Sequence, residues 1–240
     1  MAARRPMRAF YLTLGIIAVL GAFLIVRQSG FLRPTRSVTE TLAAAPVAPM
    51  AGVAVTGHVL GSDSAPVEIV EFADFECPAC ARFAYLDWPE IRQRFISTGR
   101  LKWRFMDFPL QGHVTSPPAH LAAGCAAEQG RFFEMMEAIF NRQNDWATEA
   151  KPARKLRGYA KQIGLDMSAF DACVESQHAK PGVDADYAEG ERLGVKATPT
   201  FFVNGHEWPD VLNVDQVQAI VDSLAPVGGA PRAAAPARRR

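Results

Sequence analysis

The chain has 240 residues, of which 49% are hydrophobic and 21% are charged, with a formal net charge of +1. This near-neutral total hides an asymmetry, because ten of the 26 basic residues but only one of the 25 acidic residues lie in the first 50 or the last 11 positions. The middle therefore carries about eight net negative charges, which argues against a nucleic-acid partner. Continuous apolar periodicity runs only from Gly57 to Leu224, so we expect one globular domain with an extension at each end.

The N-terminal extension contains an uncharged apolar run, Phe10–Val26, between Arg8 and Arg27. Its 17 residues are enough for a short membrane-spanning helix and exceed the ~7–15 residues of a signal-peptide core. No small-x-small cleavage sequence follows closely. We therefore expect residues 1–27 to form a membrane anchor, with a cleaved signal peptide as the alternative.

Two further segments have compositions that are typical of linkers and disordered tails. Residues 28–56 are rich in Ala and Pro, which predicts a linker. Residues 225–240 are rich in Ala, Pro, Gly and Arg, which predicts a disordered basic tail. Its arginines could contact anionic lipid, but a solvated tail is the simpler interpretation.

The domain begins with a strand that leads into a helix. Val67–Phe72 is an apolar run typical of a buried strand. Apolar residues then recur at helical spacing, at Phe83, Leu86, Ile91 and Phe95. Pro89 should kink this helix. The motif Cys77-Pro78-Ala79-Cys80 thus falls at the start of the helix.

Two cysteines at this spacing can form a redox-active disulfide or supply two ligands to a metal ion. At a helix N-terminus, free N–H groups and the helix dipole favour a thiolate, and a CxxC cysteine there can have a pKa of roughly 3.5–7.5. We expect Cys77 to be the exposed nucleophile and Cys80 to be more buried. Asp74 and Glu76 would oppose the thiolate if they pointed at it.

The sequence pattern predicts helices in the middle of the domain. Ser116 is expected to cap a helix that opens with Pro117-Pro118 and ends at Gly130. Further apolar faces occur over 132–140 and 156–163, and Asp166 is expected to cap a helix carrying Phe170 and Cys173.

The end of the domain has a strand, a hairpin and a helix. Thr198-Pro199 opens an apolar strand that runs to Val203, and Asn204-Gly205 is a strong hairpin signal. Asn213, with Gln216 three residues later, predicts a capped helix that runs to Leu224.

Several segments, in this order along the chain, resemble DsbA-like thioredoxin-fold proteins. They are Gly57–Gly61, Ala65–Val67, Glu71–Cys80, Cys125 with Gln129–Phe132, Phe170–Cys173 and Thr198–Thr200. The resemblance implies an α/β thioredoxin-like fold over 57–224, with a central mixed sheet flanked by helices and a helical insertion at about 113–180.

The resemblance also implies roles for individual residues. Pro199 would be a cis-proline facing the CxxC pair, and Thr198 and Pro199 would form the edge along which an extended substrate pairs. Glu71 matches the buried acid of the family and would therefore exchange a proton with Cys80. A solvated carboxylate at the strand end is the alternative for Glu71. Ala79 departs from the strongly oxidising relatives that carry His there.

The remaining two cysteines, Cys125 and Cys173, lie on apolar helix faces and are either a second disulfide or two buried free thiols. The family resemblance and an extracytoplasmic location favour a structural disulfide. A disulfide-bearing domain belongs outside the cytosol. We therefore expect a single-pass protein of the cell membrane with its domain on the periplasmic side, or a secreted form after signal cleavage.

Taken together, these features predict a protein-disulfide oxidoreductase that oxidises dithiols of exported proteins through Cys77 and Cys80. Its expected partners are extended cysteine-containing substrates and a membrane redox partner, with the redox-active disulfide in place of a cofactor and no metal. One alternative is a reductase or isomerase kept reduced by a membrane partner. The other is a CxxC metal-binding or chaperone module, in which His113 and His120 are conceivable further ligands.

Overall fold

The computed structural model describes residues 56–225. The expected anchor at Phe10–Val26, almost all of the linker and nearly all of the tail lie outside these residues. Within 56–225, no helix is long and apolar enough to cross a membrane.

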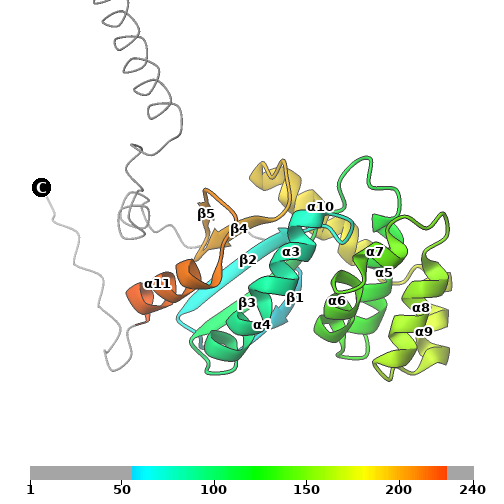
Figure 1. Cartoon of the computed structure of the whole chain (residues 1–240), viewed down its shortest axis with the longest axis horizontal. Coiled ribbons are helices and arrows are strands. Elements are labelled where there is room, and N and C mark those ends of the chain that lie inside the picture. The colour runs from blue at the N-terminus through cyan, green and yellow to red at the C-terminus, as the bar shows by residue number, and fades with distance from the viewer. Residues whose placement is uncertain (1–55, 226–240) are drawn as a thin grey trace, which may run out of the picture. The chain divides into compact units, whose positions relative to one another are not determined.

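A five-stranded mixed sheet forms the centre of the domain (Figure 1). Its strands are β1 (His58–Leu60), β2 (Val67–Ala73), β3 (Leu101–Asp107), β4 (Thr200–Val203) and β5 (His206–Trp208). They lie in the order β1-β3-β2-β4-β5; β2 and β3 are parallel, and the other neighbours are antiparallel. This is the mixed sheet of the expected thioredoxin-like fold.

Strand β2 is the central strand and is covered on both faces. Glu71 pairs in register with Phe105 of β3 and Phe201 of β4, so the end of β2 that leads to Cys77 lies between two strands. Six of its seven residues are buried, which explains why its sequence is an apolar run rather than an alternating pattern.

Helix α10 (Lys180–Leu193) covers one face of the sheet. Its side of the sheet holds an apolar cluster of Val70, Phe72, Met106, Phe108, Val195 and Phe202. The approach is close at Gly190, where an added Cβ would lie 2.4 Å from Phe108 and 3.1 Å from Phe72. The sequence pattern does not predict this helix.

The opposite face is covered by α3 (Pro78–Leu86), α4 (Trp88–Ile91), the π-helical turn η1 (Arg92–Ile96) and α11 (Val214–Leu224). Phe83 of α3 lies against Trp103 and Phe201, with ring centroids 5.7 and 5.1 Å apart. The single kinked helix expected here is instead broken at Asp87, and Pro89 stands in the first turn of α4. Leu86, the last residue of α3, is 54% exposed and is not part of the buried apolar face.

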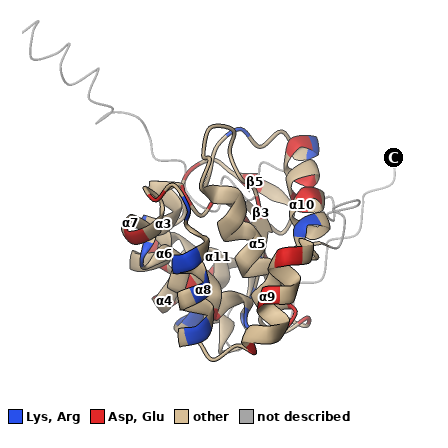
Figure 2. Cartoon of the chain, turned by 90° about the vertical axis from the view of Figure 1, so that its right-hand side faces the viewer, with Lys and Arg blue, Asp and Glu red and all other residues tan. Residues whose placement is uncertain are grey.

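Five helices lie between β3 and α10 in the sequence: α5 (Ser116–Ala127), α6 (Phe132–Phe140), α7 (Gln143–Trp146), α8 (Ala153–Gln162) and α9 (Met167–Ser176). They gather to one side of the sheet (Figure 1). Charges of both signs are spread over α8, α9 and α10 (Figure 2), and some of them pair, as Arg157 does with Asp171.

Local signals explain several element boundaries. Asp166 caps α9 by accepting hydrogen bonds from two backbone N–H groups, and Asn213 forms a capping box with Gln216 at α11. Asn204 and Gly205 both have positive φ, at 45° and 88°, and they turn β4 into β5. Ser116 does not cap α5. It is the first helical residue, and Thr115 precedes it as the N-cap residue.

Candidate active site

Cys77 lies at the N-cap of α3, where the β2–α3 loop enters the helix. Its thiolate is favoured by the neighbouring Cys80 thiol, by the Thr198 side chain and by the backbone N–H groups of Cys80 and Ala79. Together they lower the pKa of Cys77 to about 5, although burial alone would raise it. The helix start therefore provides the thiolate stabilisation that the sequence predicts.

Cys80 lies one helical turn further on and is fully buried. Burial, followed by the neighbouring Cys77 and Glu71, raises its pKa well above the ordinary thiol value. The pair is thus asymmetric, and both cysteines are free thiols in the structure. Cys77 is less exposed than expected, at 7%, and its Sγ lies against the Thr198 carbonyl.

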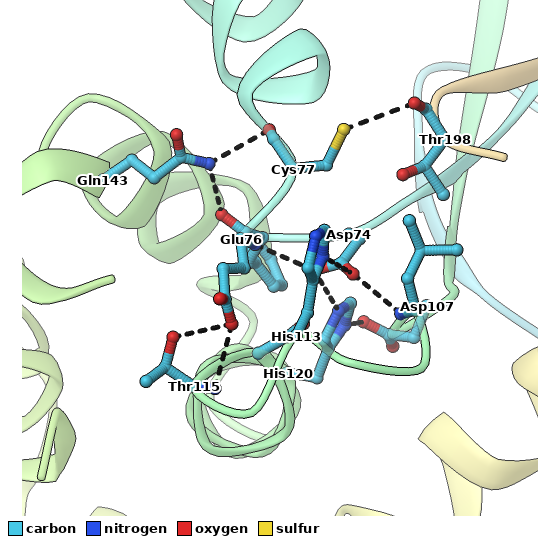
Figure 3. Close-up of polar contacts among 12 residues, drawn as sticks. Asp74, Glu76, Cys77, Asp107, His113, Thr115, His120, Gln143 and Thr198 are labelled. Atoms are coloured by element: carbon cyan, nitrogen blue, oxygen red, sulfur yellow. Dashed lines mark hydrogen bonds and ion pairs between the residues drawn. The ribbon is translucent and has the colours of Figure 1, made fainter. Parts of the chain in front are cut away.

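The Thr198-Pro199 segment faces Cys77 across the site (Figure 3). The Cys77 thiol donates to the Thr198 carbonyl oxygen at 3.3 Å, and the Thr198–Pro199 peptide bond is cis. The Thr198 hydroxyl is buried without a hydrogen-bond partner in the described part of the chain. Antiparallel pairing of β2 with β4 brings this segment, more than 120 residues away in sequence, next to Cys77.

Glu71 is a buried acid in β2 and is only 3% exposed. Burial raises its pKa to about 8; the Trp103 indole N–H, which donates at 3.2 Å, partly offsets this, and Cys77 adds to it. Glu71 is therefore mainly protonated at neutral pH. The alternative of a solvated carboxylate at the strand end is wrong, because Glu71 lies between β3 and β4.

The two acidic residues of the β2–α3 loop do not face the Cys77 sulfur (Figure 3). Asp74 accepts hydrogen bonds from Leu110 N–H at 2.7 Å and from the Ser116 hydroxyl, and it contacts His113 Nδ1 at 2.7 Å. Glu76 accepts from the backbone N–H and the hydroxyl of Thr115, at 2.9 and 2.6 Å. These bonds turn both carboxylates toward the start of α5, away from Cys77.

His113 and His120 do not join the cysteine pair. His113 contacts Asp74, and His120 Nδ1 contacts Asp107. Over residues 56–225, no group of three or more His, Cys, Asp or Glu side chains is arranged to hold a metal ion.

Gln143 makes a contact with the active-site loop that the sequence pattern does not predict. Its side-chain amide donates to the carbonyl oxygens of Phe75 and Cys77, at 2.7 and 3.0 Å, and so ties α7 to the active-site loop (Figure 3). Helix α7 has only four residues, too few to show an apolar period, so no local signal pointed to it.

Cys125 of α5 and Cys173 of α9 form a disulfide in the structure, with an S–S distance of 2.06 Å and a Cα–Cα distance of 5.8 Å. Both residues are buried, at 1% and 5% exposure. The bond links two helices of the insertion and is separate from the Cys77–Cys80 pair.

Solved structures of DsbA-like proteins have a similar fold. The oxidised form of BdbD from Bacillus subtilis is 26% identical, with a TM-score of 0.62, and the match covers 70% of this chain and 91% of that one. Alpha-DsbA1 from Wolbachia pipientis is 22% identical, with a TM-score of 0.63 and coverage of 77% and 94%. DsbA from Chlamydia trachomatis is 19% identical, with a TM-score of 0.63 and coverage of 75% and 96%. The last two likenesses show the fold alone.

Curated relatives include proteins named as Na(+)/H(+) antiporters. NhaA 3 from Salinispora tropica is 31% identical over an alignment of 233 positions, which covers 89% of this chain and 34% of that protein. NhaA from Herminiimonas arsenicoxydans is 33% identical over 166 residues, which are 69% of this chain and 25% of that protein. The chain thus spans about a third or less of these relatives, and their antiport is not assigned to it.

A family model described as thioredoxin matches residues 53–223, which include every strand of the described domain and all of its helices except the last residue of α11. The sheet order, the CxxC pair at the start of α3 and the DsbA-like neighbours agree with that match, and they support a thiol-disulfide oxidoreductase. The chain belongs to the thioredoxin family.

Proposed function

We propose that this protein oxidises dithiols of exported proteins through a Cys77–Cys80 disulfide. The observation that carries the proposal is the asymmetry of the pair: the pKa of Cys77 is lowered to about 5, whereas that of the buried Cys80 is raised. A low-pKa thiol is a good leaving group, and a buried high-pKa thiol takes up a proton once it is released.

The reaction begins when a substrate thiolate attacks the Cys77 sulfur of the disulfide. The Cys77–Cys80 bond breaks, a mixed disulfide forms between Cys77 and the substrate, and Cys80 receives the bonding electron pair. The second substrate thiolate then attacks the substrate sulfur of this mixed disulfide. Cys77 leaves as a thiolate, so the substrate is oxidised by two electrons and the protein is left as a dithiol.

Glu71 supplies the proton that Cys80 needs. Its carboxyl is mainly protonated at neutral pH, with a pKa of about 8, and when it is ionised its charge raises the pKa of Cys80. Proton transfer from Glu71 neutralises the leaving Cys80 thiolate in its buried site. In the reverse direction, the Glu71 carboxylate takes the proton back and allows Cys80 to attack.

Thiolate stabilisation supports the proposed direction of electron flow. A Cys77 pKa of about 5 lies two below pH 7, so ionisation favours the reduced form by about 3 kcal/mol relative to an ordinary thiol. This corresponds to a reduction potential raised by about 60 mV. Ala79 is exposed and adds no charge, so the backbone N–H groups, Cys80 and Thr198 supply the stabilisation.

The proposed substrates are extended segments that contain cysteine and pair along the Thr198-Pro199 edge by their backbone. From the apolar run in the sequence, we further propose that Phe10–Val26 holds the domain on the extracytoplasmic side of the membrane. A membrane redox partner would then reoxidise the dithiol after each turnover. The likeness to BdbD, solved in its oxidised form, supports the thiol-disulfide chemistry of this proposal.

The test is oxidative refolding of a reduced substrate protein by catalytic amounts of the purified, oxidised protein, in a buffer that supplies oxidised glutathione as the terminal oxidant and contains a chelator. We expect faster disulfide formation than in buffer alone, and no acceleration by the Cys77→Ser variant. A wild-type protein no faster than that variant would contradict the proposal. Thiols that become alkylatable only when the chelator is added would favour the metal-binding alternative.

A further inference from the structure

A cluster of three buried ionisable side chains lies beneath the active-site loop, and we call it the Asp74–His120–Asp107 cluster. All three residues have no exposed surface. His120 Nδ1 contacts Asp107 Oδ1, and its Nε2 lies 3.9 Å from Asp74 Oδ1 (Figure 3). The three come from the β2–α3 loop, the end of β3 and helix α5, so the cluster joins the sheet, the active-site loop and the insertion.

Other polar groups reach the cluster from the remaining elements packed around it. On the Asp107 side, His58 Nε2 of β1 lies 3.4 Å from Asp107 Oδ2, and Asp186 of α10 accepts the Asp107 backbone N–H at 3.1 Å. On the Asp74 side, the contacts are those of His113, Ser116 and Leu110. The Phe75 ring covers the imidazole of His120, with ring centroids 4.7 Å apart.

His120 is the positively charged member of the cluster. Burial alone lowers its pKa, but the Asp107 and Asp74 carboxylates outweigh burial and raise it to about 9. Burial would raise the pKa of Asp107, yet His120 and His58 hold it at about 2. The pKa of Asp74 is likewise held well below its ordinary value, by His120, Ser116 and Leu110 against the effect of burial. A buried carboxylate without such a partner would be strongly destabilising.

Asp74 connects this cluster to the reactive sulfur. Its carbonyl oxygen accepts the Cys77 backbone N–H at 3.1 Å, and its carboxylate accepts the Glu76 N–H at 2.8 Å. Asp74 thus holds the backbone that leads to Cys77 and places a negative charge three residues before it. A negative charge that lacked compensation there would oppose the Cys77 thiolate.

We propose that His120 is a positioning residue for the thiol chemistry, with a buried positive charge that compensates Asp74 and keeps the loop carboxylate from opposing the Cys77 thiolate. This inference rests on the proposed function, since it matters only if the Cys77 thiolate takes part in the reaction. It assigns a function to a histidine that contacts neither cysteine.

The test uses His120→Asn, whose amide can still donate to Asp107 but carries no charge. His178→Asn is the matched control, because His178 pairs with Glu128 on the surface, outside the active-site loop. The measurement is the pH profile of Cys77 alkylation in the reduced full-length protein. We expect His120→Asn to raise the pKa of Cys77 by about one, the low end of the ~1–3 that a nearby charge produces. Adding Asp74→Asn should lower it again, and His178→Asn should leave it unchanged.

The outcomes separate this inference from the proposed function. A wild-type Cys77 pKa near ~8.5, the free-cysteine value, contradicts the proposed function. A low wild-type pKa that a folded His120→Asn leaves unchanged overturns this inference alone, even if that variant melts earlier. If His120→Asn does not fold, the ¹⁵N resonances of wild-type His120 decide. An imidazolium at pH 7.5 supports the inference, and a neutral ring overturns it.

Discussion

Replacing Glu71 with Gln should make the domain more stable, and the gain should depend on pH. The pKa of Glu71 is raised in the folded state from its ordinary 4.5 to about 8, chiefly by burial. A carboxyl whose pKa is higher folded than unfolded weakens the fold as pH rises, because the unfolded chain releases the proton first. The loss begins near pH 4.5 and is complete above pH 8.

The magnitude follows from these two values. At pH 7 the unfolded carboxyl is ionised and the folded one is mainly protonated, so the penalty is about 3 kcal/mol. Above pH 8 it approaches about 5 kcal/mol, and below pH 4.5 it vanishes. Gln keeps an oxygen that can accept the Trp103 N–H, so the substitution removes the ionisation and leaves that hydrogen bond possible.

The assay is urea unfolding of wild type and Glu71→Gln at pH 4.5, 7 and 9. We expect the two proteins to be similar at pH 4.5 and to diverge by a few kcal/mol at pH 9. Glu207→Gln, an exposed residue of β5, serves as the control and should follow wild type at each pH. A Glu71→Gln difference that is constant across this range would refute the reasoning.

Three further predictions concern the cysteines and the motif between them. In the reduced protein, Cys77 should be alkylated first with a midpoint near pH 5, whereas Cys80 should stay unreactive; equal rates for the two thiols would contradict the asymmetry. Replacing both Cys125 and Cys173 with Ala should lower the free energy of unfolding by ~2–5 kcal/mol, as loss of a native disulfide does, without changing the alkylation profile of Cys77. Finding two free thiols at these positions by mass spectrometry of the unreduced protein would rule out that bridge. Ala79→His should raise the reduction potential of the pair, since it adds a cation beside the thiolate, and glutathione equilibration of wild type and variant would detect an unchanged or lower value.

The features that the sequence predicted well are local ones. The apolar run of β2, the CxxC motif at the start of α3, the Asn204-Gly205 turn and the Asn213 capping box each depend on residues within a few positions of one another.

What the sequence could not show depends on tertiary contacts. Asp74 and Glu76 turn away from Cys77 toward groups later in the chain, among them the Ser116 and Thr115 hydroxyls, about 40 residues away, which donate to them. The burial of Glu71 likewise requires pairing with β3 and β4. Helix α10 contains several charged residues as well as Pro181, Gly182 and Gly190, which are poor helix formers. Its apolar face was therefore not evident before the sheet that it covers was known.

The position of the Thr198-Pro199 segment next to Cys77 is an intermediate case. No local pattern brings these residues together, and the expectation came from resemblance to DsbA-like proteins. In the structure, the pairing of β2 with β4 places the Thr198 carbonyl 3.3 Å from the Cys77 sulfur.

The central claim is that Cys77 and Cys80 form an oxidising pair, and their reduction potential tests it most directly. Equilibrating the purified protein with glutathione buffers of known ratio and counting the free thiols gives this value. The stabilised Cys77 thiolate predicts a potential above thioredoxin's, about −270 mV, and the uncharged Ala79 predicts one below about −120 mV, the value of DsbA. A potential at or below about −270 mV would contradict the account and favour a reductase.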